Sequence, residues 1–137
     1  MMCWSISSPP QARYRLLYVG ADVGLSGFVQ EALKGEGWFV VRCPGGSVAE
    51  VLLRCGIHYD LLMFDEELKG GSGSEMVRLA RSLEQRKRTP VILLSRKAGG
   101  GKARQAGGRV FVQRPQPFQA VLEAIKVQSS KFKVQGR

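Results

Sequence analysis

Short apolar runs recur along this chain of 137 residues, and this pattern constrains the fold more than any other feature. The runs are continuous rather than alternating in polarity, which is typical of strands buried on both faces of a sheet. Strands that alternate with helical segments predict a parallel sheet with helices packed on its faces. We therefore predict an α/β fold whose strands cover residues 14–19, 38–42, 61–64, 91–94 and 110–112.

The segments between the runs carry apolar residues at steps of three and four, as expected for one buried face of a helix. These stripes comprise Leu25, Phe28, Val29, Ala32 and Leu33 in the first segment, Met76, Val77, Ala80 and Leu83 in the third, and Phe118, Val121, Leu122 and Ile125 in the last. A capping box from Ser47 to Glu50 predicts the start of a short second helix. Residues 66–73 are too rich in glycine to predict regular structure.

The fourth interval, residues 95–108, holds five glycines and almost no apolar face. Each glycine loses about 1 kcal/mol of helix propensity relative to alanine. We therefore predict a shortened or irregular fourth helix.

Composition divides the chain into three parts. Residues 1–12 are small, polar and proline-bearing, which predicts a flexible leader. Residues 13–127 carry all of the strand and helix patterns and are long enough for one domain with its own core. Residues 128–137 form a basic tail without acidic residues.

Lysine and arginine number 21 against 11 acidic residues, which gives a formal charge of +10. Such a charge attracts polyanions but does not determine a fold. A polyanion-binding face could comprise Arg78, Arg81, Arg86, Lys87 and Arg88 together with the tail. Because no aromatic residues are interleaved with the charges of residues 78–88, we predict a solvated surface rather than a nucleic-acid site.

The cysteines and the apolar content argue for a protein of the reducing cytoplasm. Cys3, Cys43 and Cys55 lack C-x-x-C spacing and have only His58 to join them, so we predict free thiols and no zinc site. No stretch of about 18 apolar residues and no signal peptide is present, so we predict no membrane segment.

Residues that could carry chemistry follow most of the strands. Gly20-Ala21-Asp22 follows the first, Asp65 the third, Ser95 the fourth and Arg114 the fifth. Ligands of open α/β sheets gather at the carboxyl ends of the strands. We therefore expect these residues on one edge of the sheet.

In this order the residues resemble those of the receiver domain of two-component response regulators, over about residues 13–127. The resemblance implies a doubly wound (βα)5, flavodoxin-like sheet with strand order 2-1-3-4-5. It places Asp65 at the phosphoacceptor position, Ser95 at the switch hydroxyl and Phe111 at the switch aromatic. Arg114, followed by proline, stands in place of the family's lysine. Gly73, eight residues after Asp65, matches the glycine that closes the following loop.

The chain departs from the family where the family binds magnesium, because Gly20-Ala21 replaces the two acids that hold Mg²⁺. A hard cation needs oxygen ligands, and phosphoryl transfer needs positive charge near the phosphoryl oxygens. The metal ligands that the sequence still offers are Asp22, Asp65 and Glu67, with Glu66 as an alternative. We therefore expect a weak or absent magnesium site and no other cofactor.

Arg114 is a second departure from the family, and it replaces the lysine by a side chain of different chemistry. Arginine pairs with a carboxylate through two hydrogen bonds, whereas lysine is a compact point charge. One hypothesis is that Arg114 holds Asp65 permanently; the alternative is ordinary divergence at an unused site. The interval from Ser95 to Arg114 is also about three residues shorter than in a receiver, which is close to one helical turn. The missing residues fall on the fourth helix, which is part of the face that members of the family commonly use to dimerise or to pass on a signal.

We interpret the chain as an atypical, stand-alone receiver domain in phosphorelay signal transduction. It would act through contacts with a histidine kinase or a downstream signalling protein, and would not be an enzyme beyond self-phosphorylation at Asp65. Two alternatives stay open: a working phosphoacceptor with a rearranged metal site, and a basic accessory protein associated with nucleic acid. A homodimer is also open.

Overall fold

The computed structural model describes residues 13–95, 110–113 and 118–134. The predicted leader and the predicted fourth helix lie outside these residues. The last helix, α5 (Phe118–Val134), includes residues 128–134, so this part of the predicted tail extends the helix.

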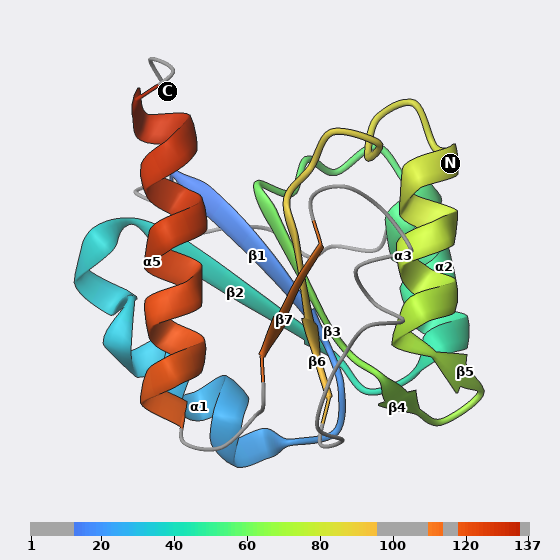
Figure 1. The fold of residues 1–137 in the computed structure, drawn as a ribbon, viewed down its shortest axis with the longest axis horizontal. Helices are drawn as coiled ribbons and strands as arrows, with labels where there is room; N and C mark the ends of the chain where they lie inside the picture. Colours follow the sequence, from blue (N-terminus) through green and yellow to red (C-terminus); the bar gives the residue numbers. More distant parts are fainter. Residues whose placement is uncertain (1–12, 96–109, 114–117, 135–137) are drawn as a thin grey trace.

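A parallel sheet of five strands forms the centre of the molecule, in the order β2-β1-β3-β6-β7 (Figure 1). The strands are β1 (Tyr14–Val19), β2 (Trp38–Cys43), β3 (Leu61–Asp65), β6 (Val91–Leu94) and β7 (Val110–Gln113). In chain order this is 2-1-3-4-5, so the predicted doubly wound, flavodoxin-like sheet is confirmed. All five predicted strands are present, with ends that agree to within one residue.

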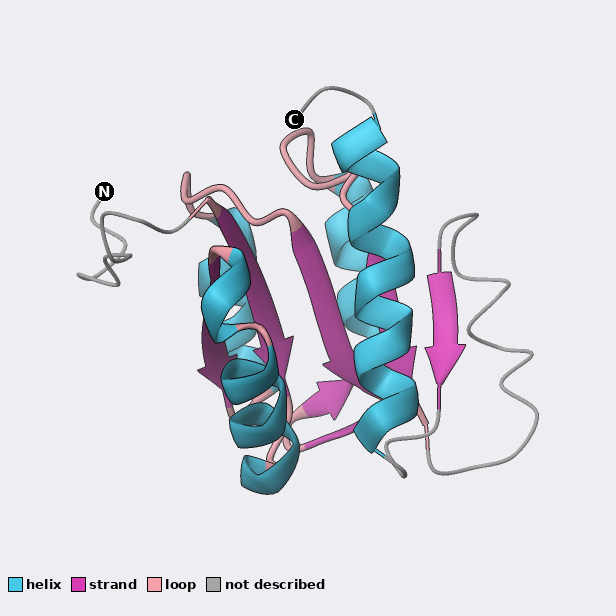
Figure 2. Ribbon diagram, turned by 90° about the vertical axis from the view of Figure 1, so that its left-hand side faces the viewer, coloured by secondary structure: helices cyan, strands magenta, loops and turns pink. Residues whose placement is uncertain are grey.

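Helices cover both faces of the sheet (Figure 2). Helices α1 (Val23–Ala32) and α5 pack on one face, and α2 (Gly46–Arg54) and α3 (Gly73–Ser82) pack on the other. A short 3-10 turn, η1 (Lys34–Glu36), follows α1 and ends at Gly37 in the left-handed conformation.

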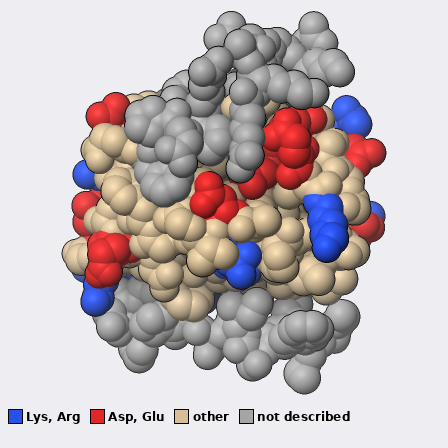
Figure 3. Space-filling view, turned by 90° about the horizontal axis from the view of Figure 1, so that it is seen from below, with Lys and Arg blue, Asp and Glu red and all other residues tan. Residues whose placement is uncertain are grey.

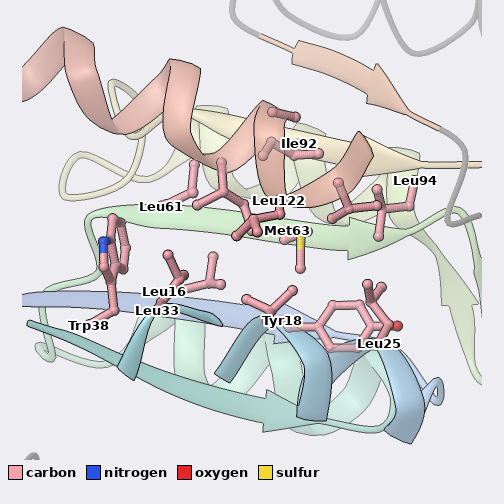
Figure 4. Packing of buried hydrophobic residues seen from close by; sticks show 14 of the residues in the cluster. Leu16, Tyr18, Leu25, Leu33, Trp38, Leu61, Met63, Ile92, Leu94 and Leu122 are labelled. Carbon is pink, nitrogen blue, oxygen red and sulfur yellow. The ribbon is translucent and has the colours of Figure 1, made fainter. Parts of the chain in front are cut away.

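Alternate residues of each strand enter two separate cores, as the period of two requires. Leu16, Tyr18 and Met63 face α1 and α5, whereas Leu17 and Phe64 face α2 and α3. Burying such a side chain contributes roughly 1.5–3 kcal/mol. Both faces are apolar because both are covered, which explains the continuous apolar runs. Figure 4 shows the core beneath α1 and α5. The Tyr18 ring lies at the opposite end of this view from Trp38, and its hydroxyl points away from Trp38.

Two local predictions are wrong. Helix α2 begins at Gly46 with Gly45 as N-cap, so Ser47 lies inside the first turn and forms no capping box, and Glu50 instead pairs with Arg54 at 3.1 Å. The loop after Asp65 contains a small antiparallel pair, β4 (Glu67–Leu68) and β5 (Gly71–Ser72). Positive φ angles at Gly70 and Gly71 allow the tight turn between them.

The predicted basic face is also wrong in part, because Arg86 is only 1% exposed. Its guanidinium donates to the backbone carbonyls of Leu52, Leu53 and Cys55 at the end of α2, at 3.3, 2.9 and 2.8 Å. It also lies 4.9 Å from the ring centroid of Tyr59. Burial lowers the pKa of Arg86 from its usual value, and the Tyr59 phenol acts in the opposite direction. Arg86 therefore caps a helix rather than binding a polyanion.

The thiol prediction holds for one cysteine. Cys43 is a buried free thiol, whereas Cys55 is disulfide-bonded, which corrects the prediction for that residue. Sequence spacing alone does not show which cysteines meet in a fold. In the described part of the chain, no helix has both the length and the apolar character needed to cross a membrane.

Candidate functional site at the carboxyl edge of the sheet

Asp65 is the last residue of β3 and is half-buried between β1 and β6. Its neighbour in β6 is Leu94, and the β1–β3 register ends with Val19 opposite Phe64. Gly20, the next residue after β1, therefore lies beside Asp65, and its amide donates to the Cys43 carbonyl at 2.8 Å. The sheet thus brings the end of β1 and Asp65 together, as predicted.

Tyr18 holds the Asp65 carboxylate. Its hydroxyl lies 3.0 Å from Oδ1 and 2.9 Å from Oδ2 of Asp65, at hydrogen-bonding distance from both oxygens. The ring is 0% exposed and belongs to the core beneath α1 and α5. Sequence analysis missed Tyr18. The only available signal was a buried tyrosine near the end of a strand, because its hydroxyl needs a hydrogen-bond partner.

Tyr18 stays protonated in this position. Burial, followed by the negative charge of Asp65 and the hydrogen bond to it, raises the pKa of Tyr18 far above its ordinary value. The Tyr18 hydroxyl is therefore a neutral donor at any physiological pH, and Asp65 is its acceptor.

Gly20 leaves room for this hydrogen bond. A Cβ at position 20 would lie 2.6 Å from Cγ of Asp65 and would overlap Asp65 Oδ2 and the Tyr18 hydroxyl. Gly20 is not among the glycines with positive φ, so contact rather than backbone conformation requires glycine here. An acid at this position, as in the resembling family, does not fit beside the Tyr18–Asp65 pair.

The other nearby acids have different roles. Asp22 is the N-cap of α1, and its Oδ1 accepts from the Leu25 amide at 2.9 Å. Glu66 Oε1 accepts from the amide and hydroxyl of Ser74 at 3.0 and 2.8 Å, in the first turn of α3. Glu67 is exposed in β4. Acidic side chains gather on this edge in Figure 3, which views it from below.

The described acidic residues at this edge do not form a three-ligand cluster. Within residues 13–95, 110–113 and 118–134, no three His, Cys, Asp or Glu side chains form a group that could hold a metal. The predicted ligands Asp22, Asp65 and Glu67 are therefore not gathered into such a group, because Asp22 turns to the helix amides and Glu67 turns to solvent.

The remaining predicted site residues are Ser95 at the same edge, Phe111 within β7, and Arg114 outside the described residues. Ser95 directly follows β6 and is buried. Phe111 lies in β7 opposite Ile92. Arg114 lies outside the described residues, so the hypothesis that it holds Asp65 stays a prediction.

Gly73 begins α3 and closes the loop tightly, as the resemblance implied. Its amide donates to the Glu66 carbonyl at 2.9 Å. A Cβ at this position would overlap the Asp65 carbonyl oxygen and would meet Leu93 Cδ1 at 2.5 Å. The return of the chain past Asp65 therefore requires a residue without a side chain.

Comparison with solved structures shows that the chain has the receiver-domain fold. A CheY-like receiver domain protein from Methanospirillum hungatei JF-1 has a TM-score of 0.75 and 20% identity, with 90% of this chain and 99% of that chain covered. The chemotaxis response regulator CheY4 of Vibrio cholerae has a TM-score of 0.74 and 19% identity, over 85% and 99%.

A third structure is the receiver domain of the sensor histidine kinase PA1611 from Pseudomonas aeruginosa PAO1, which has a magnesium ion coordinated in its active site cleft. Its TM-score is 0.71 at 23% identity, over 87% of this chain and 97% of that chain. No protein-family model and no curated protein sequence matches the chain.

Proposed function

We propose that the chain is an atypical receiver domain of phosphorelay signal transduction, with weak or absent magnesium-dependent phosphorylation at Asp65. The fold and the position of Asp65 support the first part of this proposal. The observation that carries the second part is the Tyr18 hydroxyl within hydrogen-bonding distance of both Asp65 oxygens.

Phosphoryl transfer to Asp65 would require a carboxylate oxygen to attack phosphorus while positive charge offsets the developing charge on the phosphoryl oxygens. The Tyr18 hydroxyl donates to the same oxygens and holds them toward the core side of the edge. Gly20-Ala21 offers no side-chain oxygen to a cation, and Glu66 is committed to Ser74. The site therefore provides poorly both for attack by an Asp65 oxygen and for positive charge near the phosphoryl oxygens.

Such a domain would signal through protein contacts, with a histidine kinase or a downstream signalling protein as partner. It would have no enzymatic activity beyond residual self-phosphorylation. A homodimer is compatible with this function.

The decisive experiment is incubation with a small phosphodonor and Mg²⁺, followed by intact-mass measurement at short times. We expect no gain of one phosphoryl group in the wild type and none in Asp65→Asn. The receiver domain of PA1611, which coordinates magnesium, is a suitable positive control. A clear gain that Asp65→Asn abolishes would instead establish the working phosphoacceptor with a rearranged metal site.

A further inference from the structure

We infer that Tyr18 and Gly20 form a coupled pair that keeps a second carboxylate away from Asp65. The hydroxyl of Tyr18 occupies the space that a side chain at position 20 would need. An acid at position 20 is therefore accommodated only if Tyr18 is replaced. This inference rests on the proposed function and identifies the residue responsible for the altered site.

The strand geometry brings the two positions together. Residues 18 and 20 lie two apart along the chain, so they share one side of the extended backbone. The Tyr18 ring extends along that side, and its hydroxyl ends at Asp65 of the neighbouring strand. A Cβ on Gly20 would overlap both the Tyr18 hydroxyl and Asp65 Oδ2.

The overlap cannot be relieved by moving the backbone without losing other contacts. The Gly20 amide is held by the Cys43 carbonyl at 2.8 Å, which continues the pairing of β1 with β2. The Tyr18 ring is fully buried and packs in the core that contains Leu25 and Met63. The carboxylate of Asp65 is half-buried, so it could turn toward solvent, but its hydrogen bond to Tyr18 holds it against Gly20.

The Tyr18 hydroxyl and the Asp65 carboxylate that it contacts therefore together require glycine at position 20. Without the hydroxyl, one of the two overlapping groups is gone, and the Asp65 carboxylate loses its hydrogen bond to Tyr18. Replacing the whole ring by a small side chain also removes the group that the remainder of an acidic side chain at position 20 would meet on the Tyr18 side. Two adjacent carboxylates attract a hard divalent cation.

A thermal-unfolding cycle over wild type, Gly20→Ala, Tyr18→Phe and the double variant tests the coupling. We expect Gly20→Ala to lower Tm by about 4–10 °C in the wild-type background. In the Tyr18→Phe background the same change should lower Tm by less than about half as much. Tyr14→Phe is the matched control, because Tyr14 lies in the same strand and the same core but not at Asp65, and it should leave the effect of Gly20→Ala unchanged.

Titration with Mg²⁺ by calorimetry tests the consequence for the site and gives a readout that core packing alone would not move. Gly20→Asp alone should bind Mg²⁺ no better than wild type, whereas Tyr18→Val with Gly20→Asp should bind at least about tenfold more tightly. Equal Tm losses for Gly20→Ala in both backgrounds, or equal Mg²⁺ binding by Gly20→Asp with and without Tyr18→Val, would overturn the inference. No phosphodonor is used here, so these results are separable from the phosphorylation of wild-type Asp65 that would overturn the proposed function.

Discussion

Removing a single hydroxyl group from Tyr18 tests the central contact of the site. Tyr18→Phe keeps the buried ring and deletes only the donor to Asp65. A hydrogen bond to a charged group contributes about 1.5–3 kcal/mol, and because Asp65 is partly solvated we expect a loss of about 2 kcal/mol in the free energy of unfolding.

The corresponding change in Tm follows from the size of the chain. An unfolding entropy of about 2.1 cal/mol/K per residue, over 137 residues, gives roughly 0.3 kcal/mol/K. A loss of about 2 kcal/mol therefore lowers Tm by about 7 °C. Thermal unfolding followed by circular dichroism, supported by urea unfolding at neutral pH, measures both quantities.

Tyr59 supplies the matched control. It is also fully buried, but within the described residues its hydroxyl has no hydrogen-bond partner. Tyr59→Phe removes an unsatisfied polar atom, so its effect on the free energy of unfolding should be within about 0.5 kcal/mol of zero or slightly stabilising. If Tyr18→Phe and Tyr59→Phe have the same effect, the hydroxyl of Tyr18 does not stabilise the fold through Asp65, and our account of the site is wrong.

Three further predictions concern a buried arginine, a helix cap and the dependence of stability on pH. Arg86→Leu should lower the free energy of unfolding by about 3–5 kcal/mol, because it leaves the carbonyls at the end of α2 without their donor. The control variant Arg78→Leu, at an exposed position, should change the free energy of unfolding little. Ser72→Ala should cost about 1 kcal/mol in urea unfolding through loss of the capping box at α3. Stability should fall as pH rises above about 10, where the unfolded Tyr18 ionises and the folded one does not, by up to about 1.4 kcal/mol per pH unit. Urea unfolding at stepped alkaline pH should show a smaller slope in Tyr18→Phe, and Tyr59 and Cys43 contribute to the remaining slope because burial raises the pKa of both groups.

The sheet was predictable from the sequence because its main determinant is local. Continuous apolar runs such as Leu61–Phe64 require cover on both faces, and helical periodicity between them supplies that cover. The position of Asp65 at the sheet edge followed from the same pattern, since a strand ends where its apolar run ends.

Contacts of single polar atoms were not predictable in this way. Arg86 lies in a run of basic residues that is typical of solvent exposure, yet the unpaired carbonyls at the end of α2 draw it into the core. The hydroxyl of Tyr18 reaches Asp65 across a strand boundary, and that reach depends on the register of β1 with β3. Neither contact can be recognised from a periodic pattern of residues in the sequence.

The Tyr18 contact also offers a reason for Asp65 that does not involve phosphate. A buried tyrosine hydroxyl needs an acceptor, so Asp65→Ala should lower the free energy of unfolding by about 1–3 kcal/mol, and Asp65→Asn, which keeps a carbonyl oxygen, should cost less. If Asp65 did not hold the Tyr18 hydroxyl, replacing Asp65 by alanine would leave no buried donor unsatisfied and would not lower the free energy of unfolding. The change in urea unfolding for Asp65→Ala therefore tests whether Asp65 is a structural acceptor, and a variant of unchanged or raised stability would contradict the role assigned here to Tyr18.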